Sequence, residues 1–266
     1  MKKALIILLL ILCGGVIVYG NSHWNSMTAG SISTENSSKQ AKEDSPAKEE
    51  KTSTIDSDEQ KYLSFTGNWP EEAQSLYEEK LKAGEAFHIL LMGSTEMDSI
   101  DEGWNDIVQD SLQEIYGDTI SVESMSFETS TLEFIQEEKY EEVGDLKPNL
   151  IIFEPFVFKD NGNVLIEDTL QSIGTIMDEV KKLSPGVSFV LTPPQPIYQP
   201  ANYASQVEAI QEYAQDSDIP YIDHWSNWPD VEDEEIKTYL DSVSSPNEKG
   251  HKAWAKGITE FLVKKQ

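Results

Sequence analysis

From about residue 68 onward the chain alternates short apolar runs with longer amphipathic stretches, and this alternation limits its fold more than any other feature. Short apolar runs bounded by Gly, Pro or Asp are typical of buried strands, whereas apolar residues spaced three and four apart indicate helices. The expected strands are 87–92, 120–125, 150–153, 187–191 and 220–223, and the expected helices begin near residues 70, 104, 132, 166, 203 and 247. Strands separated by helices pair in parallel, so the sequence predicts an α/β fold, a three-layer α/β/α sandwich with a five-stranded parallel sheet.

The first 20 residues predict that the rest of the chain is exported from the cytoplasm. Two Lys precede an almost wholly apolar run from Ala4 to Val18, the pattern of a signal anchor or a signal peptide. The run is near the lower limit for crossing a bilayer of roughly 30 Å. A retained anchor gives a single-pass protein of the cell membrane whose domain faces the extracellular side. Cleavage after Gly20 would give a secreted protein, and lipidation at Cys13 is a further alternative.

Residues 21–66 have a different composition, dominated by Ser, Thr, Glu, Lys and Gln with few large apolar residues. Such a segment buries too little apolar surface to offset its chain entropy, so it is expected to be a disordered polar linker. The sequence therefore predicts three parts: an anchor or signal peptide at 1–20, the linker, and a folded α/β domain at 67–266.

The charge of the chain excludes one class of partner. There are 48 acidic residues against 20 basic ones, all of them Lys, which gives a formal net charge of −28. Nucleic-acid binding depends on clustered cations, so no nucleic acid is expected as a partner. The single Cys allows neither a disulfide within the chain nor a Cys-based metal site, and no motif predicts a cofactor or a metal.

Candidate functional residues follow the expected strands, because parallel α/β sheets bind ligands at the carboxyl ends of their strands. The first strand leads into Gly93-Ser94-Thr95, where a small residue followed by hydroxyls can present a nucleophile together with backbone N–H groups. Gly-Ser-Thr is also ordinary turn chemistry.

Several segments together resemble the SGNH/GDSL hydrolase family. The Gly93 turn follows the first strand, Gly103-Trp104 opens a helix, and Pro148-Asn149 precedes the third strand. Pro246-Asn247 opens the last helix and is followed by Gly250-His251. The resemblance covers about two thirds of the chain and implies an SGNH-hydrolase-like, flavodoxin-like sandwich with esterase chemistry.

The resemblance implies a Ser or Thr nucleophile, a His base and an Asp behind it. The candidates for catalysis are Ser94 or Thr95, with His251 and Asp241. The family's nucleophile position, second after Gly93, holds Thr95, and Ser94 stands where the family has Asp. The position before Pro246, where the family has its His base, holds Ser245.

The resemblance also implies groups that bind the substrate. The backbone at Gly93 would donate to the oxyanion, and Asn161 is the Asn nearest to the family's third-strand loop position, although no Gly-x-Asn-Asp precedes it. His224 follows the fifth strand, beside Trp225 and Trp228, and is a third candidate. For His224 and His251 a structural role, as hydrogen-bonded side chains in the core, is the alternative.

Two functions are expected from this pattern. The first is an exported SGNH/GDSL-like esterase or acyl transferase acting on cell-surface carbohydrate, with a carbohydrate or acylated cell-envelope substrate as partner and the membrane contacted through the N-terminal segment. The second is a catalytically degenerate SGNH-fold protein that serves the cell envelope as a binding or scaffold module. A hydroxyl is not nucleophilic at neutral pH without an adjacent base, so the position of the His side chains distinguishes the two.

Overall fold

The structure, a computed structural model, describes residues 57–242 and 244–265. The predicted anchor or signal peptide and all but the last ten residues of the predicted linker lie outside these residues. Within the described part of the chain, no helix combines the length and the apolar character that a membrane crossing requires.

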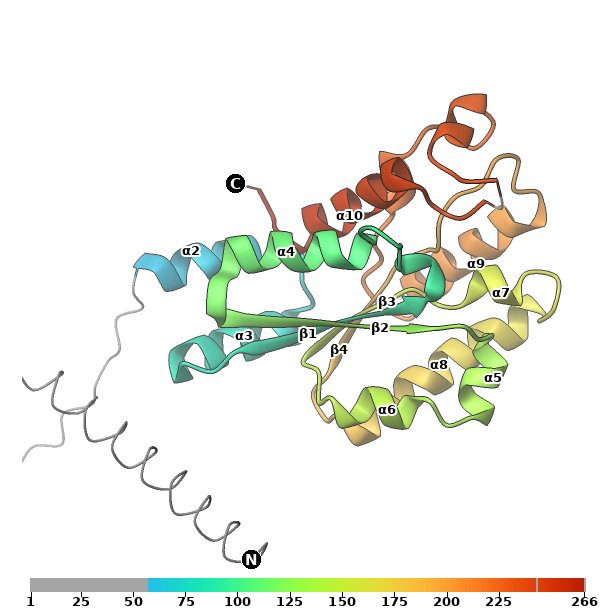
Figure 1. Cartoon of the computed structure of the whole chain (residues 1–266). Coiled ribbons are helices and arrows are strands. Elements are labelled where there is room, and N and C mark those ends of the chain that lie inside the picture. The colour runs from blue at the N-terminus through green and yellow to red at the C-terminus, as the bar shows by residue number, and fades with distance from the viewer. Residues whose placement is uncertain (1–56, 243, 266) are drawn as a thin grey trace, which may run out of the picture. The chain divides into compact units, whose positions relative to one another are not determined.

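A parallel sheet forms the centre of the domain (Figure 1). Its strands lie in the order β2-β1-β3-β4, and every pair is parallel. Residues of β3 are buried without exception, as expected of a strand covered on both faces. The strands are β1 (Phe87–Ser94), β2 (Ile120–Phe127), β3 (Leu150–Phe153) and β4 (Ser188–Leu191).

Two layers of helices cover the two faces of the sheet, each with its own apolar core. On one face the core joins α3 (Glu71–Ala83), α4 (Trp104–Tyr116) and α10 (Glu248–Leu262) to β1, β2 and β3. On the other face it joins the helices α5 (Thr131–Gln136), α6 (Tyr140–Asp145), α8 (Ile166–Leu183) and α9 (Asn202–Asp216) to β1, β3 and β4. This arrangement confirms the predicted α/β/α sandwich.

The predicted fifth strand, 220–223, is not a strand of the sheet. The sheet has four strands, and Tyr221 contributes only an isolated parallel bridge to Leu191. Pro220 has no N–H to donate, although its carbonyl accepts from the Leu191 N–H at 2.9 Å. The segment therefore lies beside β4 at one point without continuing the ladder.

Two other predicted segments differ from the structure. The expected helix 132–143 is two short helices, α5 and α6, separated at Glu138, whose φ is +53°. The polar segment 21–66 ends in a helix, α2 (Ser57–Phe65), so the prediction of disorder is wrong for its last residues. Tyr62 and Phe65 of α2 pack on Tyr116, and this apolar contact orders them.

Candidate functional site

The turn after β1 is built on a buried carboxyl group. Glu154 follows β3 directly and is completely buried, and its Oε2 accepts a hydrogen bond from the Ser94 N–H at 2.6 Å. The Ser94 hydroxyl lies beside the same carboxyl without hydrogen-bond geometry, and Ser94 is itself only 1% exposed. Gly93 permits this approach, because a Cβ there would stand 2.8 Å from Glu154 Oε2. The Ser94 hydroxyl therefore faces protein and not solvent.

Burial also sets the protonation of this carboxyl. Loss of solvation raises the pKa of Glu154 to about 8, more than the Ser94 groups lower it, so Glu154 is largely protonated at neutral pH. Its Oε1 has no hydrogen-bond partner among the described residues.

A second acidic side chain, Glu96, connects this turn to two other loops. Burial raises the pKa of Glu96, while the Ser245 side chain hydrogen-bonds to it and Asp241 adds a nearby negative charge. The buried Gln195, from the loop after β4, donates from Nε2 to Glu96 Oε2 at 3.3 Å. Asp241 is held in place by Ser245, whose N–H donates to its Oδ1 at 3.0 Å.

Thr95, one of the two hydroxyl residues expected from the resemblance to be the nucleophile, donates its hydroxyl to a carboxylate and not to a histidine. Its Oγ1 lies 2.6 Å from Oε2 of Glu128, which follows β2. Lys159, from the short helix α7 (Val157–Asp160), forms an ion pair with the other oxygen of Glu128. Lys159 and Thr95 together lower the pKa of Glu128, so this carboxylate stays ionised and is a weak base.

His251 lies in the core between α4 and α10. It is 2% exposed, and its Nδ1 accepts a hydrogen bond from the Trp104 N–H at 3.2 Å. Burial lowers the pKa of His251 despite the nearby charges of Asp98 and Asp106. This contact fixes the start of α4 rather than either candidate nucleophile.

His224 is also a core residue. Its Nε2 lies 2.8 Å from the Pro193 carbonyl, its Nδ1 accepts from Trp228 Nε1 at 3.1 Å, and its ring stacks on Trp254 at 4.6 Å. Burial lowers the pKa of His224 to about 3, so the imidazole is neutral. Both ring nitrogens are thereby occupied by structural hydrogen bonds.

The structure thus brings together only part of the predicted site. Gly93, Ser94, Thr95 and Asp241 lie around Glu96 and Glu154, but in the described part of the chain no histidine hydrogen-bonds to the Ser94 or Thr95 hydroxyl. Asn161 directly follows α7. Its backbone N–H caps that helix by donating to the Val157 carbonyl.

Sequence reasoning missed the polar residues that organise this end of the sheet, namely Glu96, Glu128, Glu154, Lys159 and Gln195. One signal for them exists in the sequence. Glu154 directly follows the wholly apolar strand 150–153, and an acid at that position either meets a ligand or needs a buried partner. The sequence does not distinguish Glu128 and Glu96 from the many other acidic residues of this chain, most of which are expected to be solvated.

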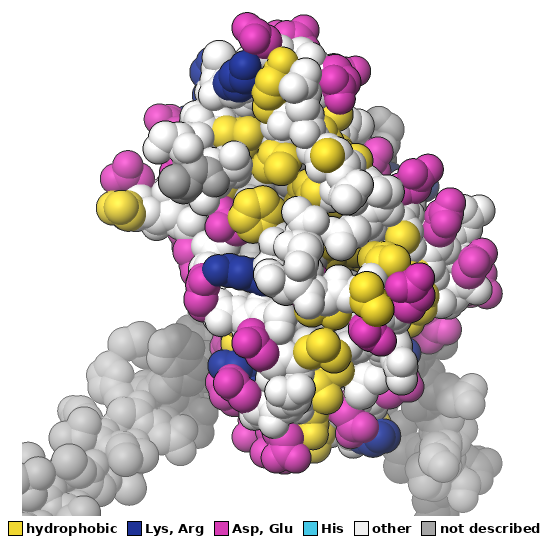
Figure 2. Space-filling model, turned by 90° about the vertical axis from the view of Figure 1, so that its right-hand side faces the viewer, with side chains coloured by type: hydrophobic (Ala, Val, Ile, Leu, Met, Phe, Trp, Pro, Cys, Tyr) yellow, Lys and Arg dark blue, Asp and Glu magenta, His cyan; other side chains and the backbone are white. Residues whose placement is uncertain are grey.

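A polar hollow of about 420 Å³ lies beside the Thr95–Glu128 pair. Figure 2 views the face on which the strands end and shows far more acidic than basic side chains around its apolar stretches. No three His, Asp or Glu side chains of the described residues gather in a way that could hold a metal ion. The hollow is lined by Glu128, Thr129, Ser130, Glu133, Lys159 and Asn163.

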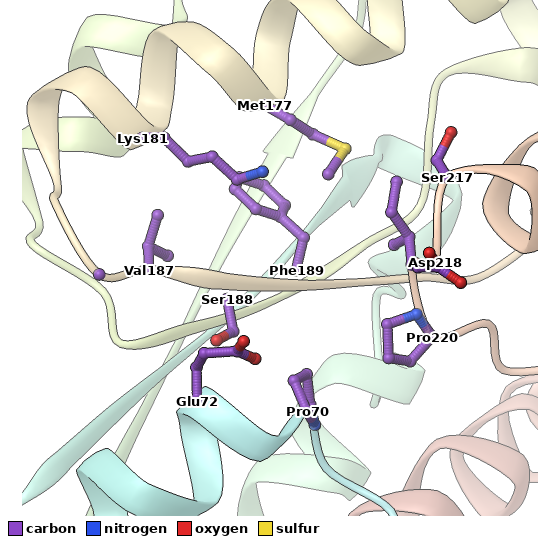
Figure 3. A pocket seen from close by; sticks show the side chains of 12 residues that line it. Pro70, Glu72, Met177, Lys181, Val187, Ser188, Phe189, Ser217, Asp218 and Pro220 are labelled. Carbon is purple, nitrogen blue, oxygen red and sulfur yellow. The ribbon is translucent and has the colours of Figure 1, made fainter.

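A second hollow, of about 340 Å³, lies at the opposite, amino end of β4 (Figure 3). Pro70, directly before α3, and Glu72 of α3 face it from one side, and Lys181 and Met177 of α8 face it from the other. It is remote from the turn after β1, because the strands are parallel and this is where β4 begins.

Comparison with solved structures identifies the fold. A protein described as a GDSL-like lipase from Parabacteroides merdae superposes with a TM-score of 0.55 over 66% of this chain and 95% of its own, at 10% identity. The acetylxylan esterase of Geobacillus stearothermophilus gives 0.53 over 66% and 94%, at 16% identity. The domain has the SGNH/GDSL hydrolase fold. A GDSL-like lipase from Bacteroides thetaiotaomicron matches 72% of this chain and 98% of its own, with a TM-score of 0.51 and 17% identity.

The fold is shared without recognisable sequence similarity. No family model matches the chain, and no curated protein matches it. In this SGNH/GDSL-fold domain, Glu154 accepts a hydrogen bond from the Ser94 N–H, and Glu128 accepts one from the Thr95 hydroxyl.

Proposed function

We propose that this chain is an exported, membrane-tethered binding module of the cell envelope, which keeps the SGNH/GDSL hydrolase fold without hydrolytic activity. One observation carries this proposal: the Thr95 hydroxyl, at the nucleophile position, is bonded to an ionised carboxylate held by Lys159. The lowered pKa makes Glu128 a weak base, so the Thr95 hydroxyl lacks the effective adjacent base that nucleophilic attack requires. The N-terminal apolar run and the polar segment after it support the tethered arrangement.

The proposed ligand is an uncharged or acylated cell-surface carbohydrate, bound at the hollow beside Thr95. The lining of that hollow supplies hydroxyl, amide, carboxylate and ammonium groups, which suit the hydroxyls of a sugar. The excess of acid around the face disfavours a phosphate-rich polymer. Figure 2 also shows apolar side chains along this face, which suit the apolar side of a sugar ring or an acyl group.

Binding is tested by calorimetric titration of the chain with acetylated and deacetylated xylo-oligosaccharides. We expect Lys159→Ala and Glu128→Ala to weaken binding about tenfold, the effect of losing one good polar contact. Lys181→Ala, in the hollow at the opposite end of β4, is the matched control and leaves binding unchanged. Equal weakening by the control, or no binding of either oligosaccharide, contradicts this ligand class.

One observation favours ester hydrolysis as a second candidate. Glu128 lies 2.6 Å from the Thr95 hydroxyl and could accept its proton. The test is labelling of the chain with a fluorophosphonate probe, together with hydrolysis of p-nitrophenyl acetate, in wild type, Ser94→Ala, Thr95→Ala and His251→Ala. A binding module is unlabelled and hydrolyses the ester equally slowly in all four. Loss of activity by about 100-fold in Thr95→Ala alone would establish the enzyme instead.

A further inference from the structure

An apolar groove lies on the surface between α4 and α10. These two helices cover the face of the sheet opposite α8 (Figure 1). Its volume is about 340 Å³. Ile107, Ser111 and Ile115 form its α4 side at successive helical turns. Ala255 of α10 and Val263, directly after α10, line the other side. The three α4 residues are only half-buried, so this stripe of the helix lacks a covering element within the described residues.

The two rims of the groove carry opposite charges. The α4 rim is acidic, because Asp110 and Glu114 lie next to the apolar stripe and are exposed, and α4 contains no Lys. The α10 rim is basic, although the chain as a whole has more than twice as many acids as Lys. Five of the 20 Lys lie in the segment 249–265, with Glu260 as the one acid there: Lys249, Lys252, Lys256, Lys264 and Lys265.

The register of the two helices places a charge on one rim level with the opposite charge on the other. The Trp104 N–H donates to His251, and the Tyr116 hydroxyl donates to the Leu262 carbonyl. The two helices therefore run parallel, and a residue of α4 lies level with the α10 residue that is 146 or 147 positions later in the sequence. By this offset Asp110 lies level with Lys256, whereas Glu114 lies level with Glu260, an acid that forms an ion pair with Lys265. Asp110 and Lys256 are both exposed, and neither forms an ion pair with another described residue.

We propose that a second copy of this chain occupies the groove, with the two-fold axis running along it. A two-fold along the groove places α4 of each copy over α10 of the other, so each Asp110 meets the partner copy's Lys256 and the apolar stripes cover each other. A two-fold across the groove would instead place acid over acid and Lys over Lys. The charge arrangement therefore selects one of the two face-to-face dimers.

Other occupants fit less well. An acidic helix would be repelled by the α4 rim, and a basic helix or polymer by the α10 rim. An anionic lipid surface would meet the exposed acids of α4 as well as the Lys residues of α10. A suitable partner places basic side chains over the acidic α4 rim and acidic side chains over the basic α10 rim. A second copy does so by symmetry, because its α10 faces α4 and its α4 faces α10.

The geometry is tested by disulfide cross-linking of the full chain in its membrane, in a Cys13→Ser background that removes the only native thiol. Two tagged chains are co-expressed, one with Asp110→Cys and one with Lys256→Cys. We expect this pair to cross-link at least about tenfold more than either variant with itself, because cross-linking requires the two thiols to come within a few ångströms. Equal cross-linking of all pairs, or of Asp110→Cys with the remote Lys181→Cys, overturns the proposed dimer.

Charge reversal tests the same interface without cysteines, by co-purification of two differently tagged full chains. Lys256→Glu alone and Asp110→Lys alone each place like charges at two symmetric contacts, so each should lower self-association about tenfold. Mixing the two variants restores one opposite-charge pair at each contact and should restore association to the wild-type level. Wild-type chains that do not associate, a mixture that stays dissociated, or capture of a different protein at this face each contradict the proposal.

Discussion

Gly93 and Glu154 depend on each other, and together they shape the turn that ends β1. The Glu154 side chain reaches the Ser94 N–H only because position 93 has no Cβ. A protonated Glu154 at neutral pH can accept this hydrogen bond without carrying a buried charge.

Replacing Gly93 by Ala should test this dependence. The new Cβ would stand 2.8 Å from Glu154 Oε2 and 2.9 Å from its Cβ, so the carboxyl group has to move away from Ser94. We expect a loss of about 1–3 kcal/mol in the free energy of unfolding, the usual cost of overpacking, measured by urea denaturation. Gly174→Ala is the control, because there the new Cβ meets only the hydroxyl at the far end of the Tyr213 side chain. An equal loss in both variants would contradict the explanation.

The protonation of Glu154 predicts a pH dependence of stability. A carboxyl with a pKa of about 8 in the folded chain and 4.5 in the unfolded chain binds more protons when folded between these values. Stability contributed by this group is therefore full below pH 4.5 and falls as the pH rises toward 8, by an amount on the order of a few kcal/mol. Glu154→Gln should flatten the dependence, as measured by urea denaturation at pH 5, 6.5 and 8. Identical slopes in the two proteins would exclude Glu154 as its source.

At the scale of elements, α10 holds together the half of the molecule that faces α4. Asn247 caps its first turn by accepting from the Lys249 and Gly250 N–H groups. Gly257 allows the segment after β4 to lie against it, since a Cβ there would come 2.6 Å from His224 Cβ. The His224 ring thereby stacks on Trp254, a residue of α10.

Removing the His224 side chain should weaken the packing of this segment on α10. His224→Ala loses the stacking on Trp254 and leaves Trp228 Nε1 and the Pro193 carbonyl unpaired, at a cost of about 3 kcal/mol in the free energy of unfolding at pH 7.5. The folded chain keeps His224 neutral down to a pKa of about 3, so its contribution falls as the pH decreases from 6.5 toward 3. The difference between wild type and variant should therefore shrink at pH 5 in urea titrations. A difference that grows at pH 5 would mean that His224 is stabilised by charge.

The elements that sequence predicted well are those whose signal is local. The strand 150–153 and the helix 166–183 coincide with β3 and α8, because a continuous apolar run and a long amphipathic period leave little choice. The prediction of a fifth strand was wrong because strand pairing depends on the neighbouring strand, and Pro220 has no N–H with which to continue the hydrogen bonds to β4. The site was only partly predictable for the same reason. Glu154, Glu128 and Gln195 act through contacts across more than 30 residues, which no local pattern contains.

At the scale of the whole molecule, the chain carries an uncompensated charge of −28. Repulsion among like charges favours the expanded chain over the compact one, and salt screens this repulsion. Most of the ion pairs among the described residues are exposed and contribute little on their own.

Salt should therefore stabilise this protein. Raising NaCl from about 0.01 M to 0.15 M shortens the screening length from about 30 Å to about 8 Å, so the midpoint of thermal unfolding should rise by a few degrees. Choline chloride at equal ionic strength is the control and should act equally, because the effect is screening and not binding of sodium. A fall in the midpoint, or a rise with sodium alone, would contradict screening as the cause.

The two ends of the domain meet at Leu262. Its carbonyl accepts from Trp69 Nε1 at 2.9 Å and from the Tyr116 hydroxyl at 2.7 Å, and the Lys264 N–H donates to the Phe65 carbonyl at 2.8 Å. Because α10 completes the core on its face of the sheet, this core closes only when Trp69 and Leu262, 193 residues apart in the sequence, come together. Contacts of such long sequence separation form slowly, so the packing of α10 is expected to be a late step of folding.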